Sequence, residues 1–251
     1  MARVVAVALQ KGGVGKTTTV VSLAHILATK GMKVLVIDLD PQANASQWLD
    51  AVAPTGHGVL ACLDGRPVRK EIVSLPIGLD LLAANRALSV AEITLINKLA
   101  REHILRKALE PILNDYDCIL IDTQPSLGVL TLNALTAAHD LIVPVECKSL
   151  SLNGIVDLQE VVELVRASTN PGLRIMGYVA TRVGRNKLSD DVARELRKAF
   201  GEQVFRTMIR ENVRLGEAPS AHKPISMYDQ RSSGAEDYNA LAREVLGRLE
   251  A

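Results

Sequence analysis

Two lysines and three glycines lie close together directly after the first apolar run of the chain. The stretch reads Gln10-Lys11-Gly12-Gly13-Val14-Gly15-Lys16-Thr17-Thr18, and a helical pattern begins at its end. Glycines let backbone N–H groups curl around phosphate oxygens, and the positive end of a following helix attracts the same anion. Lys16 can then reach the β- and γ-phosphates of a nucleotide, while Thr17 can ligate Mg²⁺ and Thr18 can donate to the α-phosphate. The stretch therefore predicts a phosphate-binding loop.

Three aspartates follow apolar runs in positions that suit such a loop. Asp38 and Asp40 end the run that begins at Val34, and Asp122 ends the run that begins at Cys118. Ligands of open α/β sheets bind beyond the carboxyl ends of the strands, so these carboxylates are expected beside bound phosphates. The simpler interpretation is that each aspartate only caps the turn that follows it. The phosphate-binding loop favours the first interpretation.

Short apolar runs rich in β-branched residues alternate with amphipathic segments of helix length. Such runs are typical of strands buried on both faces of a parallel sheet. The alternation predicts an α/β fold, a doubly wound and mostly parallel sheet flanked by helices with right-handed crossovers. Strands are expected at Val4–Leu9, Val34–Leu39, Leu79–Ala83, Cys118–Ile121, Leu141–Val145, Ile175–Ala180 and Val204–Met208, and helices at Thr17–Thr29, Glu102–Leu113, Leu127–Ala138, Leu152–Arg166, Asp190–Phe200 and Ala235–Leu249. The irregular stretch Ala51–Pro76 is interpreted as an insertion over one edge, and residues 1–251 as a single domain.

The composition is that of an ordinary globular protein and excludes several classes. Hydrophobic residues make up 48% of the 251 residues and charged residues 23%, and the net charge is +1, so no overall basic field points to nucleic acid. The three cysteines are scattered without a CxxC pair, which argues against disulfides, zinc and iron–sulfur sites. No apolar stretch reaches about 18 residues and no signal peptide is present, so we expect a cytoplasmic protein that does not span a membrane.

The residues Lys11–Thr18 resemble the deviant Walker A motif of the ParA/MinD superfamily of P-loop ATPases. They depart from the common G-x-x-x-x-G-K-[ST] pattern, because Gln10 stands where the first glycine is expected. The resemblance implies that Lys11 reaches across a dimer interface, so that two ATP molecules lie between two copies of the chain. It implies ATP and Mg²⁺ as cofactors, with the ATP site formed by Lys11, Gly12, Gly13, Val14, Gly15, Lys16, Thr17 and Thr18 and with both lysines as catalytic residues.

The segment Asp38-Leu39-Asp40-Pro41-Gln42-Ala43-Asn44 resembles switch I of the same superfamily. The resemblance assigns Asp40 to the attacking water, as a third catalytic residue. It assigns Thr17, Asp38 and Asp122 to Mg²⁺ and its waters, with Asp122 as the Walker B carboxylate. Relatives usually read D-x-P-P at this point. This chain has Gln124 in place of the first proline, which bears on the shape of switch II and on the hydrolysis rate.

Several further motifs, spaced in the right order, resemble the ParA/Soj group. They are Leu127–Leu135, Leu141–Cys147 and Asn212-Val213-Arg214-Leu215-Gly216-Glu217-Ala218-Pro219-Ser220, which is close to the group's N-V-R-L-S-E-A-P-S. Relatives often read I-P-R-N just before the last motif, in a loop near the adenine, whereas this chain has Arg210 and Glu211 there. Asn212 is the expected adenine contact. The chain end is too short and acidic for the membrane helix of MinD-like proteins, and only nine residues precede Gln10, so no N-terminal DNA-reading domain is expected.

Positive charge gathers between Thr181 and Arg231, where 11 Lys/Arg stand against seven Asp/Glu. Partition ATPases of this group bind double-stranded DNA without sequence preference as ATP dimers. The resemblance maps their basic residues onto Arg185 and Arg214, with Arg182 and Lys187 as further candidates. Contact with DNA phosphates needs only cations gathered on one face. The simpler interpretation is a solvated face with surface salt bridges.

The resemblance as a whole implies a cytoplasmic, nucleoid-associated ATPase of DNA partition. Its ATP-bound homodimer is expected to bind DNA, and a ParB-type centromere-binding partner is expected to stimulate hydrolysis and so release the DNA. One alternative is an orphan ParA-like or MinD-like ATPase that positions a protein cargo without a role in DNA segregation. A more remote alternative is a metabolic P-loop enzyme that phosphorylates a small molecule. Lys11, which the resemblance places across a dimer interface, argues against this alternative.

Overall fold

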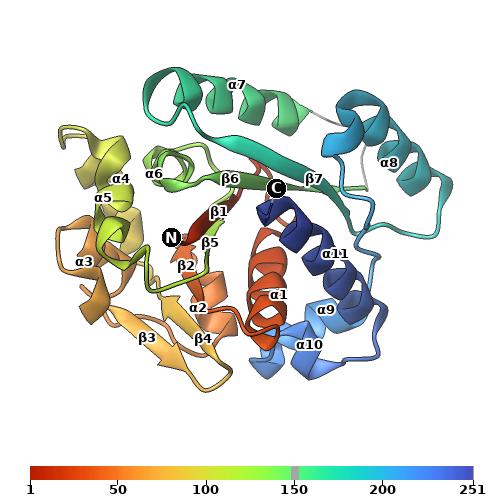
Figure 1. Ribbon diagram of the computed structural model, residues 1–251, viewed down its shortest axis with the longest axis horizontal. Coiled ribbons are helices and arrows are strands. Elements are labelled where there is room, and N and C mark those ends of the chain that lie inside the picture. Colours follow the sequence, from red (N-terminus) through yellow and green to blue (C-terminus); the bar gives the residue numbers. More distant parts are fainter. Residues whose placement is uncertain (148–152, 251) are drawn as a thin grey trace.

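Seven strands form one sheet in the computed structural model, which describes residues 1–147 and 153–250 (Figure 1). The order across the sheet is β3-β4-β2-β5-β1-β6-β7, and every neighbouring pair is parallel except β3 with β4. The strands are β1 (Arg3–Val7), β2 (Val34–Leu39), β3 (Ile72–Leu75), β4 (Leu79–Leu82), β5 (Cys118–Thr123), β6 (Asp140–Glu146) and β7 (Arg174–Thr181). The α/β doubly wound fold is confirmed. The chain order reverses around β1, which is where such sheets bind ligands.

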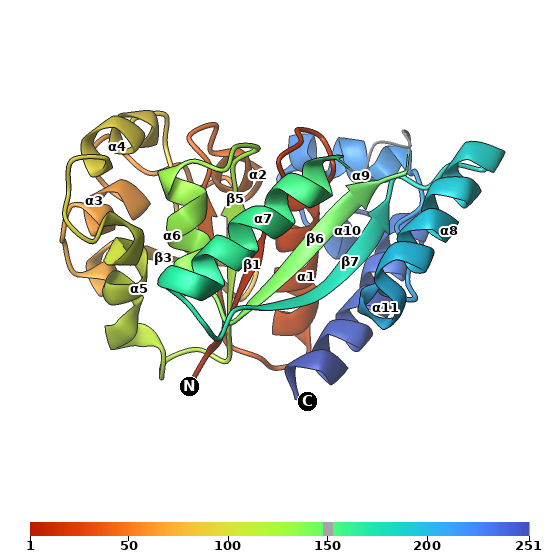
Figure 2. The same cartoon turned by 90° about the horizontal axis from the view of Figure 1, so that it is seen from above.

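Helices cover both faces of this sheet (Figures 1 and 2). One face carries α1 (Lys16–Thr29), α2 (Asn44–Trp48), α10 (Ile225–Tyr228) and α11 (Ser233–Leu249), and α9 (Val213–Glu217) lies beside α10. The other face carries α3 (Val59–Leu63), α4 (Leu88–Leu95), α5 (Ile104–Leu109), α6 (Val129–Ala137), α7 (Asn153–Ser168) and α8 (Lys187–Phe200). Short 3₁₀ turns complete the path: η1 (Val68–Lys70), η2 (Arg101–His103), η3 (Glu110–Ile112), η4 (Gly201–Gln203) and η5 (Ala218–Ala221).

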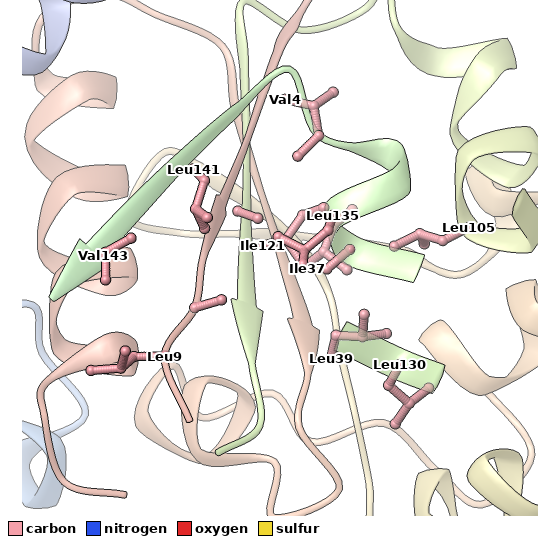
Figure 3. Packing of buried hydrophobic residues seen from close by; sticks show 14 of the residues in the cluster. Val4, Leu9, Ile37, Leu39, Leu105, Ile121, Leu130, Leu135, Leu141 and Val143 are labelled. Carbon is pink, nitrogen blue, oxygen red and sulfur yellow. The ribbon is translucent and has the colours of Figure 1, made fainter. Parts of the chain in front are cut away.

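The buried residues divide into two apolar clusters, one on each face of the sheet. Successive residues of a strand point to opposite faces, so every central strand contributes to both clusters. Val4, Ile37 and Ile121 meet Leu130 and Leu135 of α6 on one face (Figure 3). The neighbouring strand residues, Val5, Val36 and Leu120, pack with α1 on the other face. Two buried layers hold the strand ends, and therefore the site, in a fixed frame.

One expected strand is absent from the described structure. Val204–Met208 does not form a strand, although it runs beside β7 and Phe205 N–H donates to Tyr178 O at 2.9 Å. The N–H groups of Arg206 and Thr207 donate instead to the Glu244 carboxylate of α11, at 2.9 and 2.7 Å. Backbone donors that serve a side chain cannot extend a strand ladder, so the prediction was wrong.

Other predicted elements are shorter or begin elsewhere. The helix expected over Glu102–Leu113 is divided into η2, α5 and η3, with Pro111 inside η3. β3 and α4 were not predicted. Of the helix expected at Leu152–Arg166, Leu152 lies outside the described residues and α7 covers the rest. Within residues 1–147 and 153–250, none of the helices is both long enough and apolar enough to cross a lipid bilayer.

Candidate active site

The phosphate-binding loop joins the end of β1 to the start of α1. Gly13 and Gly15 have φ of +74° and +92°, a left-handed conformation that glycine adopts without the strain other residues carry. Gly15 also caps the start of α1. Glycine thus stands at both loop positions with a positive φ, and phosphate binding by this loop stays a prediction. The first turn of α1 brings Lys16, Thr17 and Thr18 to the carboxyl ends of the strands.

Lys16 is buried and folds back over the loop. Its Nζ donates to Lys11 O at 2.9 Å and to Leu9 O at 3.3 Å. Burial lowers the pKa of this ammonium, while the charges of Asp122 and Asp40 act to raise it. Lys16 thus lies within electrostatic reach of two of the three predicted aspartates. A buried ammonium held by backbone carbonyls is poised to meet a polyanion.

Asp38 and Asp122 occupy opposed register positions of the parallel strands β2 and β5. Asp38 is buried, and its Oδ2 accepts hydrogen bonds from Ser46 N at 2.8 Å and Ser46 Oγ at 2.7 Å. Its Oδ1 accepts from the backbone N–H of Asp40 at 3.2 Å. Burial raises the pKa of Asp38 to about 6 against these hydrogen bonds. Ser46, which the sequence analysis missed, fixes the orientation of this carboxylate.

Asp122 is completely buried, and neither carboxylate oxygen has a hydrogen bond of normal geometry. Burial, and then the Asp38 charge, raise the pKa of Asp122 well above its usual value, and the Thr17 hydroxyl acts in the opposite direction. A buried carboxylate without a donor is costly unless a cation completes it. Such a group fits Mg²⁺, with the Thr17 hydroxyl at hand as a further ligand.

The described residues hold no group of three or more His, Cys, Asp or Glu side chains arranged to grip a metal alone. Mg²⁺ keeps several waters and is commonly bound through one or two carboxylates together with the phosphates of a nucleotide.

Asp40 lies just beyond the end of β2 and is only 5% exposed. Its Oδ1 accepts from the N–H of Gln42 at 2.8 Å, so the residue forms a tight turn at the start of switch I. Leu39 and Thr123 form the last register pair of β2 and β5, so Asp40 and Gln124 are the residues that follow on the two strands. Asp40 is thus placed at the same edge of the sheet as Lys16 and Asp122.

Lys11 is held by a residue that the sequence analysis did not single out. Its Nζ lies 3.1 Å from Oε2 of Glu146, the last residue of β6. Arg182 Nη1 lies 3.3 Å from the other oxygen of Glu146 and 3.3 Å from Gly13 O. Arg182, predicted to bind DNA, therefore braces the phosphate-binding loop. An acid at a strand end carries no distinctive sequence signal, and only the parallel sheet brings it to the loop.

The loop between β5 and α6, residues 124–128, corresponds to switch II and is tied to α4 through Gln124, which departs from the family pattern. Gln124 is 7% exposed, and its Nε2 donates to Oε1 of Glu92 at 2.5 Å. Glu92 Oε1 also comes so close to Gly128 that a Cβ there would lie 2.6 Å from it. The far end of the loop is held by Thr131, whose hydroxyl donates to Ser126 O at 2.6 Å. The sequence analysis did not single out Glu92 either.

Both ends of the Asn212 side-chain amide form hydrogen bonds within the chain. Its Oδ1 accepts from Arg214 N at 2.7 Å as the cap of α9, and its Nδ2 donates to Ser233 Oγ at 2.6 Å. The preceding Arg210 forms a bidentate ion pair with Asp237. The adenine contact of Asn212 stays a prediction.

The basic residues come from two segments that lie side by side. Val183 and Arg210 form a parallel bridge, and Glu211 N donates to Val183 O at 3.0 Å. Arg185 and Lys187 are exposed just before and at the start of α8. Arg214 is engaged with acids, with Nη1 2.8 Å from Glu217 Oε2. The two segments lie side by side, Arg182 and Arg214 are partly neutralised by acids, and DNA binding by these residues stays a prediction.

The chain is similar to known proteins over nearly its whole length. The AAA domain family model matches residues 2–175. Chromosome partitioning protein ParA of Caulobacter vibrioides is 44% identical over 252 residues, which cover 98% of this chain and 94% of that protein. Chromosome-partitioning ATPase Soj of Thermus thermophilus is 44% identical over 249 residues, 99% of this chain and 97% of that protein.

A solved structure with the same fold carries ligands. It is cobyrinic acid a,c-diamide synthase from Mycobacterium smegmatis with bound ATP analog and magnesium, with a TM-score of 0.89 and 35% identity over 100% of this chain and 97% of that chain. A glycine loop with its lysine, set at the switch point of a doubly wound sheet, places this protein among the P-loop ATPases. The chain belongs to the AAA domain family and, within it, to the ParA/Soj group of chromosome-partitioning ATPases.

Proposed function

We propose that this protein is a DNA partition ATPase that converts ATP and water to ADP and phosphate with the help of Mg²⁺. The observation that carries the proposal is the buried, unpaired carboxylate of Asp122, opposite Asp38 and beside Lys16 at the mouth of the phosphate-binding loop. A cation that arrives with a polyphosphate compensates such a carboxylate. The names of the Caulobacter and Thermus relatives support the partition role.

Each residue has a role in the proposed reaction. Gly12–Thr18 bind the phosphates through backbone N–H groups, with Lys16 against the β- and γ-phosphates. Thr17 and Asp122 hold Mg²⁺, and Asp38 orients its waters. Asp40 orients the attacking water. Phosphoryl transfer needs mainly positioning and charge neutralisation. Lys16 and Mg²⁺ would supply the positive charge, and the three aspartates would position the metal and the attacking water.

The ATP-bound state is proposed to be a homodimer in which Lys11 leaves Glu146 and contacts the nucleotide of the other subunit. The dimer then binds double-stranded DNA on the nucleoid without sequence preference, through Arg185 and Lys187, with Arg182 and Arg214 as additional cations. A ParB-type centromere-binding partner stimulates hydrolysis and releases the DNA. The single P-loop domain, residues 1–251, is proposed to work in the cytoplasm without binding a membrane.

The experiment is binding to a random-sequence DNA duplex with ATP, ADP or no nucleotide, at two salt concentrations. Sequence-independent binding that requires ATP and weakens at high salt is the expected result. Asp40→Ala should trap the DNA-bound state, because ATP is bound but not cleaved. Normal turnover by Asp40→Ala would move the catalytic role to another residue.

A second candidate is an ATPase that positions a protein cargo without a role in DNA segregation. The observation that favours it is the pairing of Arg182 and Arg214 with Glu146 and Glu217, which reduces the positive charge offered to DNA. ATP hydrolysis with no DNA binding in any nucleotide state would support this candidate and contradict the partition role.

A further inference from the structure

Gln124 and the proposed hydrolytic residue Asp40 each directly follow one of two neighbouring strands of the sheet. The parallel pairing of β2 with β5 runs Asp38 with Asp122 and Leu39 with Thr123, so Asp40 and Gln124 are the residues that follow on each strand. Strands in such a sheet are separated by about 4.8 Å. Asp40 and Gln124 are 5% and 7% exposed, so both residues are almost entirely enclosed by the protein.

The orientation of the Gln124 amide is determined by Glu92. An ionised carboxylate only accepts hydrogen bonds, so the 2.5 Å contact with Glu92 Oε1 requires the Nε2 end of the amide. The carbonyl Oε1 is therefore left as the acceptor of the side chain. Glu92 is itself fixed, because α4 is anchored in the core through Leu88, Ala91 and Leu95.

We propose that Gln124 is a further catalytic residue of ATP hydrolysis, whose Oε1 accepts a hydrogen bond from the attacking water, and that Glu92 is its positioning residue. The inference rests on the proposed function. The water oxygen forms a bond to the γ-phosphorus as the bond from that phosphorus to the bridging oxygen breaks. ADP leaves with the electron pair of that bond, and the proton of the water ends on the released phosphate. Gln124 orients the water and is not itself protonated, which is a recognised way to assist this transfer.

The test compares Gln124→Met and Glu92→Gln in single-turnover ATP hydrolysis. Methionine keeps the volume of the side chain and removes the acceptor, so Gln124→Met should lower the rate about ten- to a hundred-fold. Affinity for a non-hydrolysable ATP analogue should change by less than about two-fold, because the interaction belongs to the transition state. Glu92→Gln offers Gln124 either end of an amide, so the orientation is no longer fixed and the rate should fall about three- to ten-fold.

A double variant distinguishes positioning from a general structural effect. If Glu92 acts through Gln124, Glu92→Gln should have no further effect on the rate in a Gln124→Met background. Gln159→Met is the matched control, because it makes the same substitution on α7. The amide that it removes donates to Tyr178 Oη of β7 at 3.1 Å. This control should leave the rate unchanged. Additive losses in the double variant would remove Glu92 from its positioning role.

Asp40→Ala separates this inference from the proposed function. If Asp40→Ala abolishes turnover while Gln124→Met hydrolyses ATP at the normal rate, the inference is overturned and the site assignment stands. If Asp40→Ala turns over normally, the site assignment fails and the inference fails with it. Thermal unfolding of each variant shows whether the fold is kept, and Glu92→Gln tests the same contact should Gln124→Met unfold.

Discussion

Asp38 and Asp122 face each other across β2 and β5, at opposed register positions, and neither is exposed to solvent. Burial raises the pKa of both carboxyls, to about 6 for Asp38, and the Asp38 charge raises that of Asp122 further. Two acids placed in this way oppose folding once they ionise. Proteins keep such arrangements where a ligand compensates them.

Asp122→Asn should therefore stabilise the metal-free protein while it impairs its chemistry. At pH 8 in a chelator the variant should gain about 1–2 kcal/mol of unfolding free energy, because a fully buried carboxylate that repels Asp38 is replaced by a neutral amide. ATP turnover should become slower and should need a higher Mg²⁺ concentration, because one carboxylate that holds the metal is lost. Thermal unfolding and a magnesium titration of turnover measure the two effects.

Asp140→Asn is the control for this stability effect. Asp140 is equally buried, but its carboxylate pairs with Arg174 Nη2 at 3.0 Å and with Arg3. Removing a satisfied carboxylate should cost about 1–3 kcal/mol. Equal stability changes in Asp122→Asn and Asp140→Asn would contradict the account of Asp122 as an uncompensated charge.

The two lysines of the phosphate-binding loop should have separable effects. Lys16→Ala should abolish nucleotide binding, since Lys16 is the buried cation beside Asp122 and Asp40. Lys11→Ala should bind nucleotide but stay monomeric with an ATP analogue. Equilibrium nucleotide binding and analytical ultracentrifugation distinguish them. Micromolar binding by Lys16→Ala, or an ATP-dependent dimer of Lys11→Ala, would refute the corresponding role.

Charge reversal at Arg185 should weaken DNA binding more than reversal at Arg214. Arg185 is exposed, whereas Arg214 already pairs with Glu217 and lies 3.5 Å from Asp229. Both variants should still dimerise with ATP. Binding to a random duplex over a salt series measures the loss, and Arg185→Glu should also reduce the salt slope. Undiminished binding by both variants would remove this surface from the DNA interface.

His25 should make stability depend on pH. It lies on α1 with Nδ1 2.7 Å from Ser226 Oγ, and burial lowers the pKa of its imidazole below the usual 6.5. The unfolded chain then binds the proton more readily, so this contribution to stability is full above about pH 6.5 and is lost as the pH falls through the folded pKa. His139 acts in the same direction. His25→Gln should therefore unfold with a shallower pH dependence between about pH 7 and 5 in chemical denaturation. An unchanged slope would contradict this role.

The sequence predicts those parts of the site that are local in the chain. The loop residues Lys11–Thr18 are contiguous, and Asp38 and Asp122 are marked by the apolar strands that they end. Glu146 and Glu92 were missed because they meet their partners only through the fold. Glu146 is brought to Lys11 by the pairing of β1 with β6.

The same reasoning explains why parts of the fold prediction were wrong. Val204–Met208 has the residue types of a strand, yet the carboxylate of Glu244, far along the chain, takes two of its backbone donors. β3 is apolar but has only four residues at the edge of the sheet, so it is too short to stand out as a separate strand in the sequence. Local patterns identify the buried centre of the sheet well, and long-range contacts decide its edges.

The enclosure of α1 has a consequence for where this molecule can move. Residues 19–27 of the helix are buried between the sheet, α10 and α11. Amide hydrogens in such a helix exchange with solvent only when the whole domain opens, whereas those of exposed loops exchange through small local fluctuations. Isotope exchange should thus be slow in α1 in every nucleotide state and should change chiefly in the segments beyond the strand ends. We therefore expect α1 to keep its position during the ATPase cycle while the segments beyond the strand ends change conformation.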